Sequence, residues 1–217
     1  YTTIRTRSKL RVCTTIVASD SATELVEPAG FIDVDEIQEL LNKVDDLATR
    51  PSYDDTLRAS LLGFCIMGSM PPGCPIHTYA DLAKLAVGPE TVIVIDSVVG
   101  LVPLLNELAL IGTKNAMLKV NLSELCSLVM AASKDVSNTI SNREKHVWTV
   151  TRSFLYEYPD AGKALSHIAI TNGKEDAFLV TLRRANTSAK TETSSAQISE
   201  ERIQAIWTMP VPKLPEN

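Results

Sequence analysis

Alternating side chains at the start of the chain predict an extended strand over residues 1–18. Uncharged residues such as Ile4, Val12 and Ile16 occupy even positions. Four cations occupy odd positions: Arg5, Arg7, Lys9 and Arg11. A strand places alternate side chains on opposite faces, about 7 Å apart along each face, so the cations are expected to share one face. Residues 19–32 contain a proline and a glycine and are predicted to form a loop.

Apolar residues then recur at helical spacing, which predicts a helical core over about residues 33–142. The predicted helices occupy residues 33–48, 52–65, 78–85, 103–111 and 121–136. Thr78 and Asn121 are each followed by an acid three positions later, which is the pattern of a capping box. Pro103 is suited to the start of a helix, and Gly112 is suited to its end.

After the N-terminal segment, strand signals are confined to one short run in the middle of the chain and to its last third. Residues 91–95 are β-branched and predict a buried strand, with the start of a buried helix as the alternative. Residues 146–158 and 177–182 are also predicted to be strands, whereas residues 163–171 fit either a helix or a strand. The predicted fold class is therefore α+β, with a mainly helical core and strands from the N-terminal segment and the C-terminal third.

The C-terminal part of the chain differs in composition from the rest. Residues 185–199 are rich in Ser, Thr and Ala, which is typical of a flexible linker, and residues 200–209 are predicted to form a short helix. We therefore predict a single globular domain over residues 1–184, followed by a linker and a C-terminal arm over residues 185–217. The predicted oligomerisation anchors of this arm are Ile203, Ile206, Trp207 and Leu214. The arm is expected to dock on a neighbouring copy or to fold back on its own domain.

Composition and charge exclude several classes of protein. The chain has 217 residues, of which 45% are hydrophobic and 22% are charged, and this balance is typical of a globular protein. No apolar run is long enough to span a membrane, and no apolar signal segment is visible at the start, so we expect neither secretion nor a transmembrane segment. The net charge is −5, although the first eleven residues hold four cations and no acid.

No pattern in the sequence is diagnostic of an enzyme or of a metal site. The four cysteines are Cys13, Cys65, Cys74 and Cys126. They form no C-x-x-C pair, which favours free thiols and a reducing compartment. The motifs of P-loops, dinucleotide-binding folds, zinc proteases and serine hydrolases are absent. We therefore predict a non-catalytic protein with no catalytic residue, no metal and no cofactor, and we expect no small-molecule substrate.

The basic face of the N-terminal strand is the leading candidate for a binding site. Cations at successive positions on one face can contact successive phosphates, either of an RNA backbone or of an anionic membrane surface. The assigned residues are Arg5, Arg7, Lys9 and Arg11. The alternative is an edge strand whose cations protect it against aggregation. Because aromatic residues make up only 5% of the chain, any contact with nucleic acid is expected to be with its backbone.

Residues 33–75 contain an order of parts that resembles the matrix proteins of negative-strand RNA viruses. An amphipathic helix (IQELLNKVDDLATR) is followed by a second apolar helix (TLRASLLGFCIMGS) and by a loop rich in proline and glycine (MPPGCP). The resemblance implies a non-enzymatic protein that self-assembles and bridges a nucleocapsid to a membrane. The helical middle and the terminal arms fit a nucleocapsid or coat protein equally well.

These observations lead to one main prediction of function and one alternative. The main prediction is a self-assembling viral structural protein of the matrix, nucleocapsid or coat type, which binds further copies of itself and RNA or an anionic membrane surface. Such a protein would be located in the virion and in the host cytoplasm. The alternative is a monomeric cellular helical interaction or adaptor domain, located in the cytoplasm.

Overall fold

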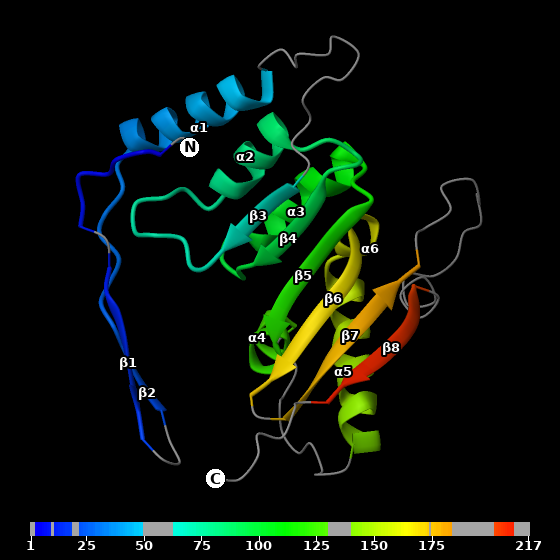
Figure 1. The fold of residues 1–217 in the computed structure, drawn as a ribbon. Helices are drawn as coiled ribbons and strands as arrows, with labels where there is room; N and C mark the ends of the chain where they lie inside the picture. Colours follow the sequence, from blue (N-terminus) through cyan, green and yellow to red (C-terminus); the bar gives the residue numbers. More distant parts are fainter. Residues whose placement is uncertain are drawn as a thin grey trace.

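The computed structural model describes residues 3–9, 11–18, 22–49, 63–129, 140–173, 175–183 and 202–210. These residues build a six-stranded sheet with helices packed on it and a separate two-stranded hairpin (Figure 1). The strands are β1 (Cys13–Val17), β2 (Ala22–Val26), β3 (Gly63–Met67), β4 (Val92–Asp96), β5 (Asn115–Asn121), β6 (Leu165–Asn172), β7 (Glu175–Leu182) and β8 (Ile203–Met209). The helices are α1 (Val34–Thr49), α2 (Thr78–Ala86), α3 (Leu101–Ile111), α4 (Leu122–Leu128), α5 (Ile140–Glu157) and α6 (Ala161–Ala164).

The large sheet follows the order of the chain, β3-β4-β5-β6-β7-β8. Strands β3 to β6 are parallel, whereas β7 and β8 are each antiparallel to the strand before them. Each parallel connection contains one or more helices, and such crossovers are right-handed in nearly all proteins. A sheet that grows in one direction through right-handed crossovers collects its helices on one face. In Figure 1 the strands accordingly lie in front of α3 and α5.

The core lies between this one face of the sheet and the helices. Alternate strand residues such as Ile93 and Phe178 are fully buried there. They pack in one apolar cluster with Leu104 of α3 and with Phe154 of α5. Every second residue of the strands therefore packs against the apolar stripes of the helices in a single interface.

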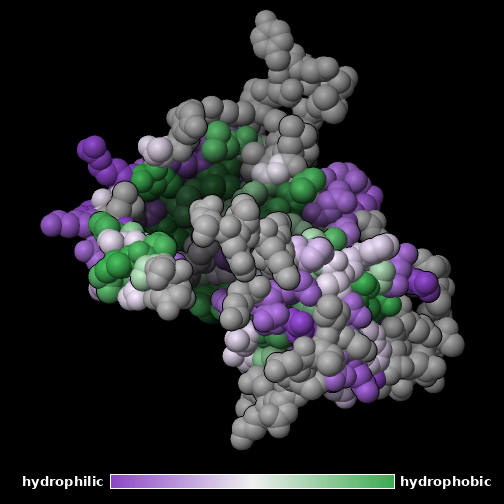
Figure 2. Space-filling model, turned by 60° about the horizontal axis from the view of Figure 1, so that its bottom comes forward, coloured by the Kyte–Doolittle hydropathy of each residue, from purple (hydrophilic) through white to green (hydrophobic). Residues whose placement is uncertain are grey.

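The hairpin formed by β1 and β2 stands apart from this core. Every residue of β1 is exposed, and Figure 2 shows hydrophobic surface on the left-hand lobe that holds the hairpin. The segment before β1 is held against α1 and the loop that precedes it. Arg7 forms an ion pair with Asp33 at 2.6 Å, and the hydroxyl of Ser8 donates a hydrogen bond to the carbonyl oxygen of Phe31 at 2.6 Å. These contacts fix the base of the hairpin but not its tip.

The predicted α+β class with a helical core is wrong, because the centre of the molecule is a mixed six-stranded sheet and the fold is α/β. Strand β3 occupies the end of the segment predicted to be a helix over residues 52–65, and residues 52–62 lie outside the described residues. Strand β5 lies between two predicted helices and was not expected. Residues 19–32, predicted to be a loop, contain β2, and the N-terminal strand is limited to β1.

Two predictions in the last third are reversed by the structure. Residues 146–158 were predicted to be a strand, but all of them except the last belong to helix α5, in which Val147, Val150, Thr151 and Phe154 are buried at helical spacing. Residues 200–209, predicted to be a helix, contain strand β8, which is held by pairing with β7. The apolar pattern of a short segment can fit both a helix and a strand, and packing against the rest of the molecule decides which of the two forms.

Other local predictions are confirmed by the structure. The helices predicted over residues 33–48 and 103–111 are α1 and α3, and the strand predicted over residues 91–95 is β4. Gly112 ends α3 with a φ of 75°. The capping box at Asn121 is present, whereas no side chain caps the start of α2. Among the described residues, none of the helices has the length and apolar character to cross a bilayer.

The predicted C-terminal arm lies partly within the sheet. Ile203 and Ile206 of β8 pack against the core, whereas Trp207 is 61% exposed. Leu214 and the predicted linker over residues 185–199 lie outside the described residues. The role of these residues in oligomerisation stays a prediction.

Candidate functional site

A pocket of about 200 Å³ lies at the carboxyl ends of the parallel strands. Its lining residues come from the loops after β3 and β4 and from the start of α4: Gly68, Ser69, Asp96, Ser97, Val98, Val99 and Glu124. We call it the carboxyl-edge pocket. Open α/β sheets bind their ligands at this edge, because the loops and the helix N-termini meet there. Its volume is below the range of about 300–1,000 Å³ that encloses a whole drug-sized ligand, so it is suited to one polar group of a larger ligand.

An ion pair joins two neighbouring strands beside this pocket. Lys119 Nζ of β5 lies 3.0 Å from Oδ1 and 2.9 Å from Oδ2 of Asp96, the last residue of β4. The Lys119 side chain remains 43% exposed and that of Asp96 28% exposed. A partly exposed pair of this kind contributes little to stability, since water already solvates both charges. Both groups are therefore accessible to a ligand at modest energetic cost.

Glu124 is fixed at the pocket by the capping box of α4. The Asn121 side chain accepts a hydrogen bond from the Glu124 amide at 2.8 Å, and Glu124 Oε2 accepts one from the Asn121 amide at 2.8 Å. The capping box occupies only one of the two carboxylate oxygens. A carboxylate is thereby positioned on the same edge as Asp96.

Two glycines shape the loops around the pocket. Gly68 follows β3 with a φ of 81°, and its amide donates a hydrogen bond to the carbonyl oxygen of Asp96 at 2.9 Å. Gly100 precedes α3 with a φ of 73°, and a Cβ atom there would lie 2.9 Å from the carbonyl oxygen of Ile76. Only glycine is free of strain in that conformation and that space. No side chain caps α3, whose N-terminus directly follows the pocket residues 97–99 and favours negative charge.

Tyr79 of α2 supports the pocket from its inner side. Burial raises the pKa of the Tyr79 hydroxyl, and its hydrogen bond with the Ser97 side chain partly opposes this rise in pKa. The hydroxyl is therefore protonated at neutral pH and acts as a neutral group that positions Ser97. Burial also raises the pKa of the nearby Cys74 thiol, which makes Cys74 a poor nucleophile.

The structure brings one of the four predicted phosphate- or lipid-binding residues to this pocket. Arg11 Nη1 donates a hydrogen bond to the hydroxyl of Ser69 at 3.2 Å. Arg7 is instead paired with Asp33, while Arg5 and Lys9 are exposed. All four precede β1 rather than lying on one strand. Their binding role stays a prediction.

The described residues contain no cluster of three or more His, Cys, Asp and Glu side chains that is arranged to hold a metal ion. All four cysteines are free. The Cys126 Sγ atom lies 3.7 Å from Nε2 of His146, in the packing of α4 against α5. Burial raises the pKa of the Cys126 thiol, which favours its protonated form.

The site residues predicted from the sequence did not include Asp96, Lys119, Ser69 or Glu124. A signal was present for Asp96, which directly follows the β-branched run of the predicted strand. Lys119 was hidden because β5 was not predicted. Glu124 was recognised only as a capping residue. The residues converge only when the order of the parallel strands is known.

The sheet is open and mostly parallel, with a polar site at its carboxyl edge, and solved structures of phosphofructokinases share its fold. The tetrameric inhibited form of phosphofructokinase-2 from Escherichia coli aligns with a TM-score of 0.54 at 16% identity, covering 91% of this chain and 59% of that chain. The same enzyme in complex with fructose-6-phosphate aligns with a TM-score of 0.50 at 17% identity, and the alignment covers 87% of this chain and 55% of that chain. Its complex with potassium aligns with a TM-score of 0.51 at 16% identity, covering 88% and 56%. This chain therefore spans between 55% and 59% of the length of these enzymes.

No protein-family model matches the chain, and no curated protein matches it. The likeness to the solved structures concerns the fold, since the identities are low.

The likeness corrects the prediction of a non-catalytic viral structural protein. The fold is shared with solved structures of an enzyme, phosphofructokinase-2, and neither the family models nor the curated proteins gave a match that supports a matrix, nucleocapsid or coat protein. The partner prediction is contradicted on the same finding, because no small-molecule substrate was expected and a matching structure is a complex of phosphofructokinase-2 with fructose-6-phosphate. The alternative of a helical adaptor domain fails as well, because the core is built on a sheet. Location in a virion has no support.

Proposed function

We propose that this chain forms part of a small-molecule kinase and that its carboxyl-edge pocket binds a phosphorylated ligand. The observation that carries the proposal is the convergence of Asp96, Lys119 and Glu124 at the carboxyl edge of a sheet with the phosphofructokinase-2 fold. Such an enzyme transfers the terminal phosphoryl group of a nucleoside triphosphate to a hydroxyl oxygen of the acceptor, whose proton is released. Catalysis of this transfer depends on positioning and on charge, which the pocket is built to supply.

Lys119 is the residue proposed to bind the phosphate. Its ammonium group already lies beside the pocket and is held there by Asp96. A phosphate oxygen can replace Asp96 as the partner of the ammonium, and such charge-assisted hydrogen bonds are about twice as strong as neutral ones. The N-terminus of α3 adds a positive partial charge on the same side of the pocket.

Asp96 and Glu124 fit the needs of a magnesium ion that accompanies a nucleotide. Magnesium is usually bound through one or two carboxylates together with the phosphates and waters. The two carboxylates line the same pocket, and only one oxygen of Glu124 is used in the capping box. When bound, magnesium would neutralise part of the phosphate charge.

Arg11 is proposed to add a second positive charge from the hairpin side. It reaches the pocket through Ser69, which itself lines the pocket. In this proposal the hairpin base and the sheet edge contact the same ligand. Of the four predicted phosphate-binding residues, Arg11 is therefore the one assigned to the pocket.

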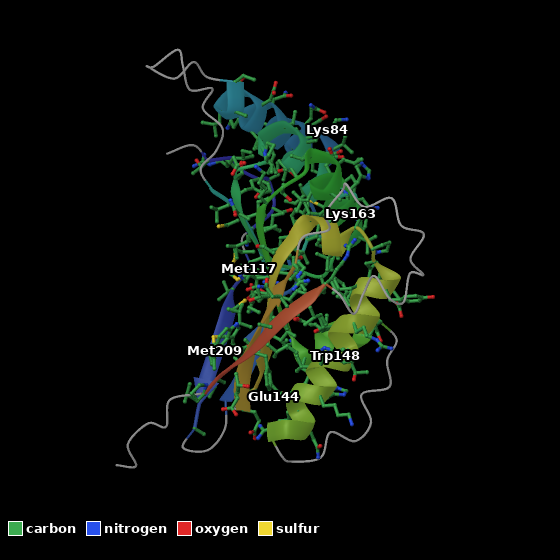
Figure 3. All side chains as sticks on the ribbon, turned by 90° about the vertical axis from the view of Figure 1, so that its right-hand side faces the viewer. Lys84, Met117, Glu144, Trp148, Lys163 and Met209 are labelled. Atoms are coloured by element: carbon green, nitrogen blue, oxygen red, sulfur yellow. The ribbon has the colours of Figure 1, made fainter. Side chains whose placement is uncertain are left out.

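The proposal is tested by calorimetric titration of the chain with fructose 6-phosphate and, separately, with ATP and magnesium. The wild type is compared with Lys119→Met and Arg11→Met. Lys84→Met serves as the control, because Lys84 belongs to helix α2 and does not line the pocket (Figure 3). Removing one charge-assisted hydrogen bond is expected to weaken binding by about tenfold to a hundredfold in Lys119→Met. Arg11→Met should have a smaller effect, since its side chain is more exposed.

Lys84→Met is expected to bind as tightly as the wild type. Unphosphorylated fructose serves as the control ligand and is expected to bind more weakly than fructose 6-phosphate. The proposal is contradicted if neither phosphorylated ligand binds. It is also contradicted if Lys119→Met and Lys84→Met retain the same affinity.

A further inference from the structure

The carboxyl-edge pocket has one apolar wall, which is formed by two adjacent valines in the loop after β4. Val98 is partly buried and packs against the core, whereas Val99 is 41% exposed. The other lining residues are glycine or carry polar side chains: Gly68, Ser69, Asp96, Ser97 and Glu124. Val99 therefore presents an apolar surface to whatever enters a pocket that is otherwise polar.

The loop holds Val99 in place through hydrogen bonds and a turn. The Ser97 hydroxyl donates a hydrogen bond to the carbonyl oxygen of Val99 at 3.3 Å, and the Ser97 side chain is itself hydrogen-bonded to Tyr79. Gly100, with its φ of 73°, then turns the chain into α3. Because these contacts constrain the loop on both sides of Val99, little conformational freedom is lost when a ligand packs on it.

Further apolar side chains lie around the same loop. Val102 in the first turn of α3 is 36% exposed, and Ile76 in the loop before α2 is 55% exposed. At Gly100 a Cβ atom would lie 2.9 Å from Cε of Met70 and 2.9 Å from the carbonyl oxygen of Ile76, so the loops after β3 and β4 touch there. We call these four residues the apolar rim of the pocket: Met70, Ile76, Val99 and Val102.

Single exposed apolar residues are common on protein surfaces and need no explanation. The apolar rim differs because its four members gather beside a polar pocket. Ligand sites typically combine apolar walls with a few polar groups that fix the orientation of the ligand. Since the pocket of about 200 Å³ is suited to one polar group, the rest of a ligand has to lie outside it, where the apolar rim begins.

The chemistry of the apolar rim discriminates between classes of ligand. Its side chains offer no hydrogen-bond donor, and the Met70 sulfur is only a weak acceptor. A polyhydroxylated skeleton packed there would lose hydrogen bonds to water without replacing them. An aromatic or aliphatic skeleton would instead remove apolar surface from water on both sides of the contact.

We infer that the phosphorylated ligand of the carboxyl-edge pocket carries an aromatic or aliphatic carbon skeleton next to its phosphate, and that this skeleton packs on the apolar rim. The inference rests on the proposed function and names the class of ligand that its site prefers. The phosphate lies in the pocket, beside Lys119 and the N-terminus of α3. Val99 is the specificity-determining residue, because it is the member of the apolar rim that also lines the pocket.

The inference is tested by calorimetric titration of the 217-residue chain with phenyl phosphate, fructose 6-phosphate and inorganic phosphate. Phenyl phosphate is expected to bind about tenfold more tightly than either of the others, since a small apolar group in an apolar site contributes a factor of about this size. Val99→Ser should remove this advantage and leave the affinity for inorganic phosphate unchanged. Val99→Ile should keep the advantage, because its side chain remains apolar.

Leu110→Ser is the matched control. Leu110 is 82% exposed and belongs to α3, but it lies near the end of the helix remote from the pocket. This variant is expected to bind all three ligands as the wild type does.

Two results would overturn the inference and leave the proposed function standing. One is that phenyl phosphate binds no more tightly than fructose 6-phosphate, although both bind. The other is that Val99→Ser weakens the binding of inorganic phosphate as much as that of phenyl phosphate, because the valine would then support the pocket and not the carbon skeleton. If none of the three ligands binds, the proposed function and the inference both fail.

Discussion

The two faces of the central sheet have similar side chains but different surroundings. On β4, Ile93 and Ile95 are fully buried against the helices, whereas Val92 between the same two neighbouring strands is 53% exposed. A β-branched residue is typical of both positions. The difference shows that apolar character in a strand does not by itself create a core. The helices on one face remove its residues from water, and the opposite face gains no comparable stabilisation from the described residues.

The largest expected effect separates the two faces directly. Phe178→Ala on the covered face should lower the free energy of unfolding by about 3–5 kcal/mol, because it removes a fully buried ring and leaves a cavity. Trp207→Ala lies on the neighbouring strand but on the opposite face of the sheet, which we call the bare face because the described residues leave it uncovered, and it should cost less than about 1 kcal/mol. Denaturant unfolding of the 217-residue chain measures both. Equal losses of stability would show that the bare face is buried.

A second prediction concerns Gly100, which lies in the loop between β4 and α3 beside the pocket. Gly100→Ala should destabilise the protein by about 1–3 kcal/mol, since the residue has a positive φ and its new Cβ would crowd the carbonyl oxygen of Ile76. Gly112→Ala is the matched control, with a φ of 75° and no atom within 4 Å of the new Cβ. Thermal unfolding should show a smaller loss for Gly112→Ala. A larger loss at Gly112 would contradict the steric argument.

A third prediction concerns the capping box beside the pocket. Asn121→Ala should lower stability by about 1 kcal/mol, because the Glu124 amide loses its hydrogen-bond acceptor. Asn121→Ser retains a capping oxygen and should recover most of the stability. The two variants are compared by denaturant unfolding. If Asn121→Ser is no more stable than Asn121→Ala, the cap is not the source of the effect.

The smallest expected effect is on the bare face itself. Val92→Thr keeps the β-branched shape and adds a hydroxyl at an exposed position, so stability should change by no more than about 0.5 kcal/mol. Ile95→Thr would place the same hydroxyl in the buried core beside it and should cost more. Side-by-side unfolding of these two variants sharpens the comparison between the faces. A large loss for Val92→Thr alone would contradict it.

The sequence supported local features better than the arrangement of the sheet. Helix α3 was predictable because three local signals indicate the same helix: Pro103 near its start, apolar residues at helical spacing, and Gly112 at its end. Strand β5 carried a usable signal, since the apolar residues Ala116, Leu118 and Val120 alternate with positions that include two asparagines and Lys119. That signal was missed because the segment lies between two strong helical patterns. Strand β8 depends on pairing with β7, which no local pattern reveals.

The candidate site was less predictable than the fold. Asp96 and Lys119 are 23 residues apart in the sequence and meet only because β4 and β5 are parallel neighbours. Arg11 and Ser69 are separated by 58 residues and meet through the placement of the hairpin base. Charge counting identified Arg11 but assigned it to a strand with three other cations. In the structure Arg11 instead contacts Ser69 at the edge of a pocket that is also lined by the carboxylates of Asp96 and Glu124.

The most direct test of the proposed function is to locate a bound phosphorylated ligand on the chain. Amide chemical shifts of the isotope-labelled protein are followed by nuclear magnetic resonance during titration with fructose 6-phosphate. We expect saturable shifts at residues 68–69, 96–99 and 119–124, with little change in α5. Shifts confined to other surfaces, or none at any concentration of the ligand, would contradict a phosphate-binding pocket at the carboxyl edge of the sheet.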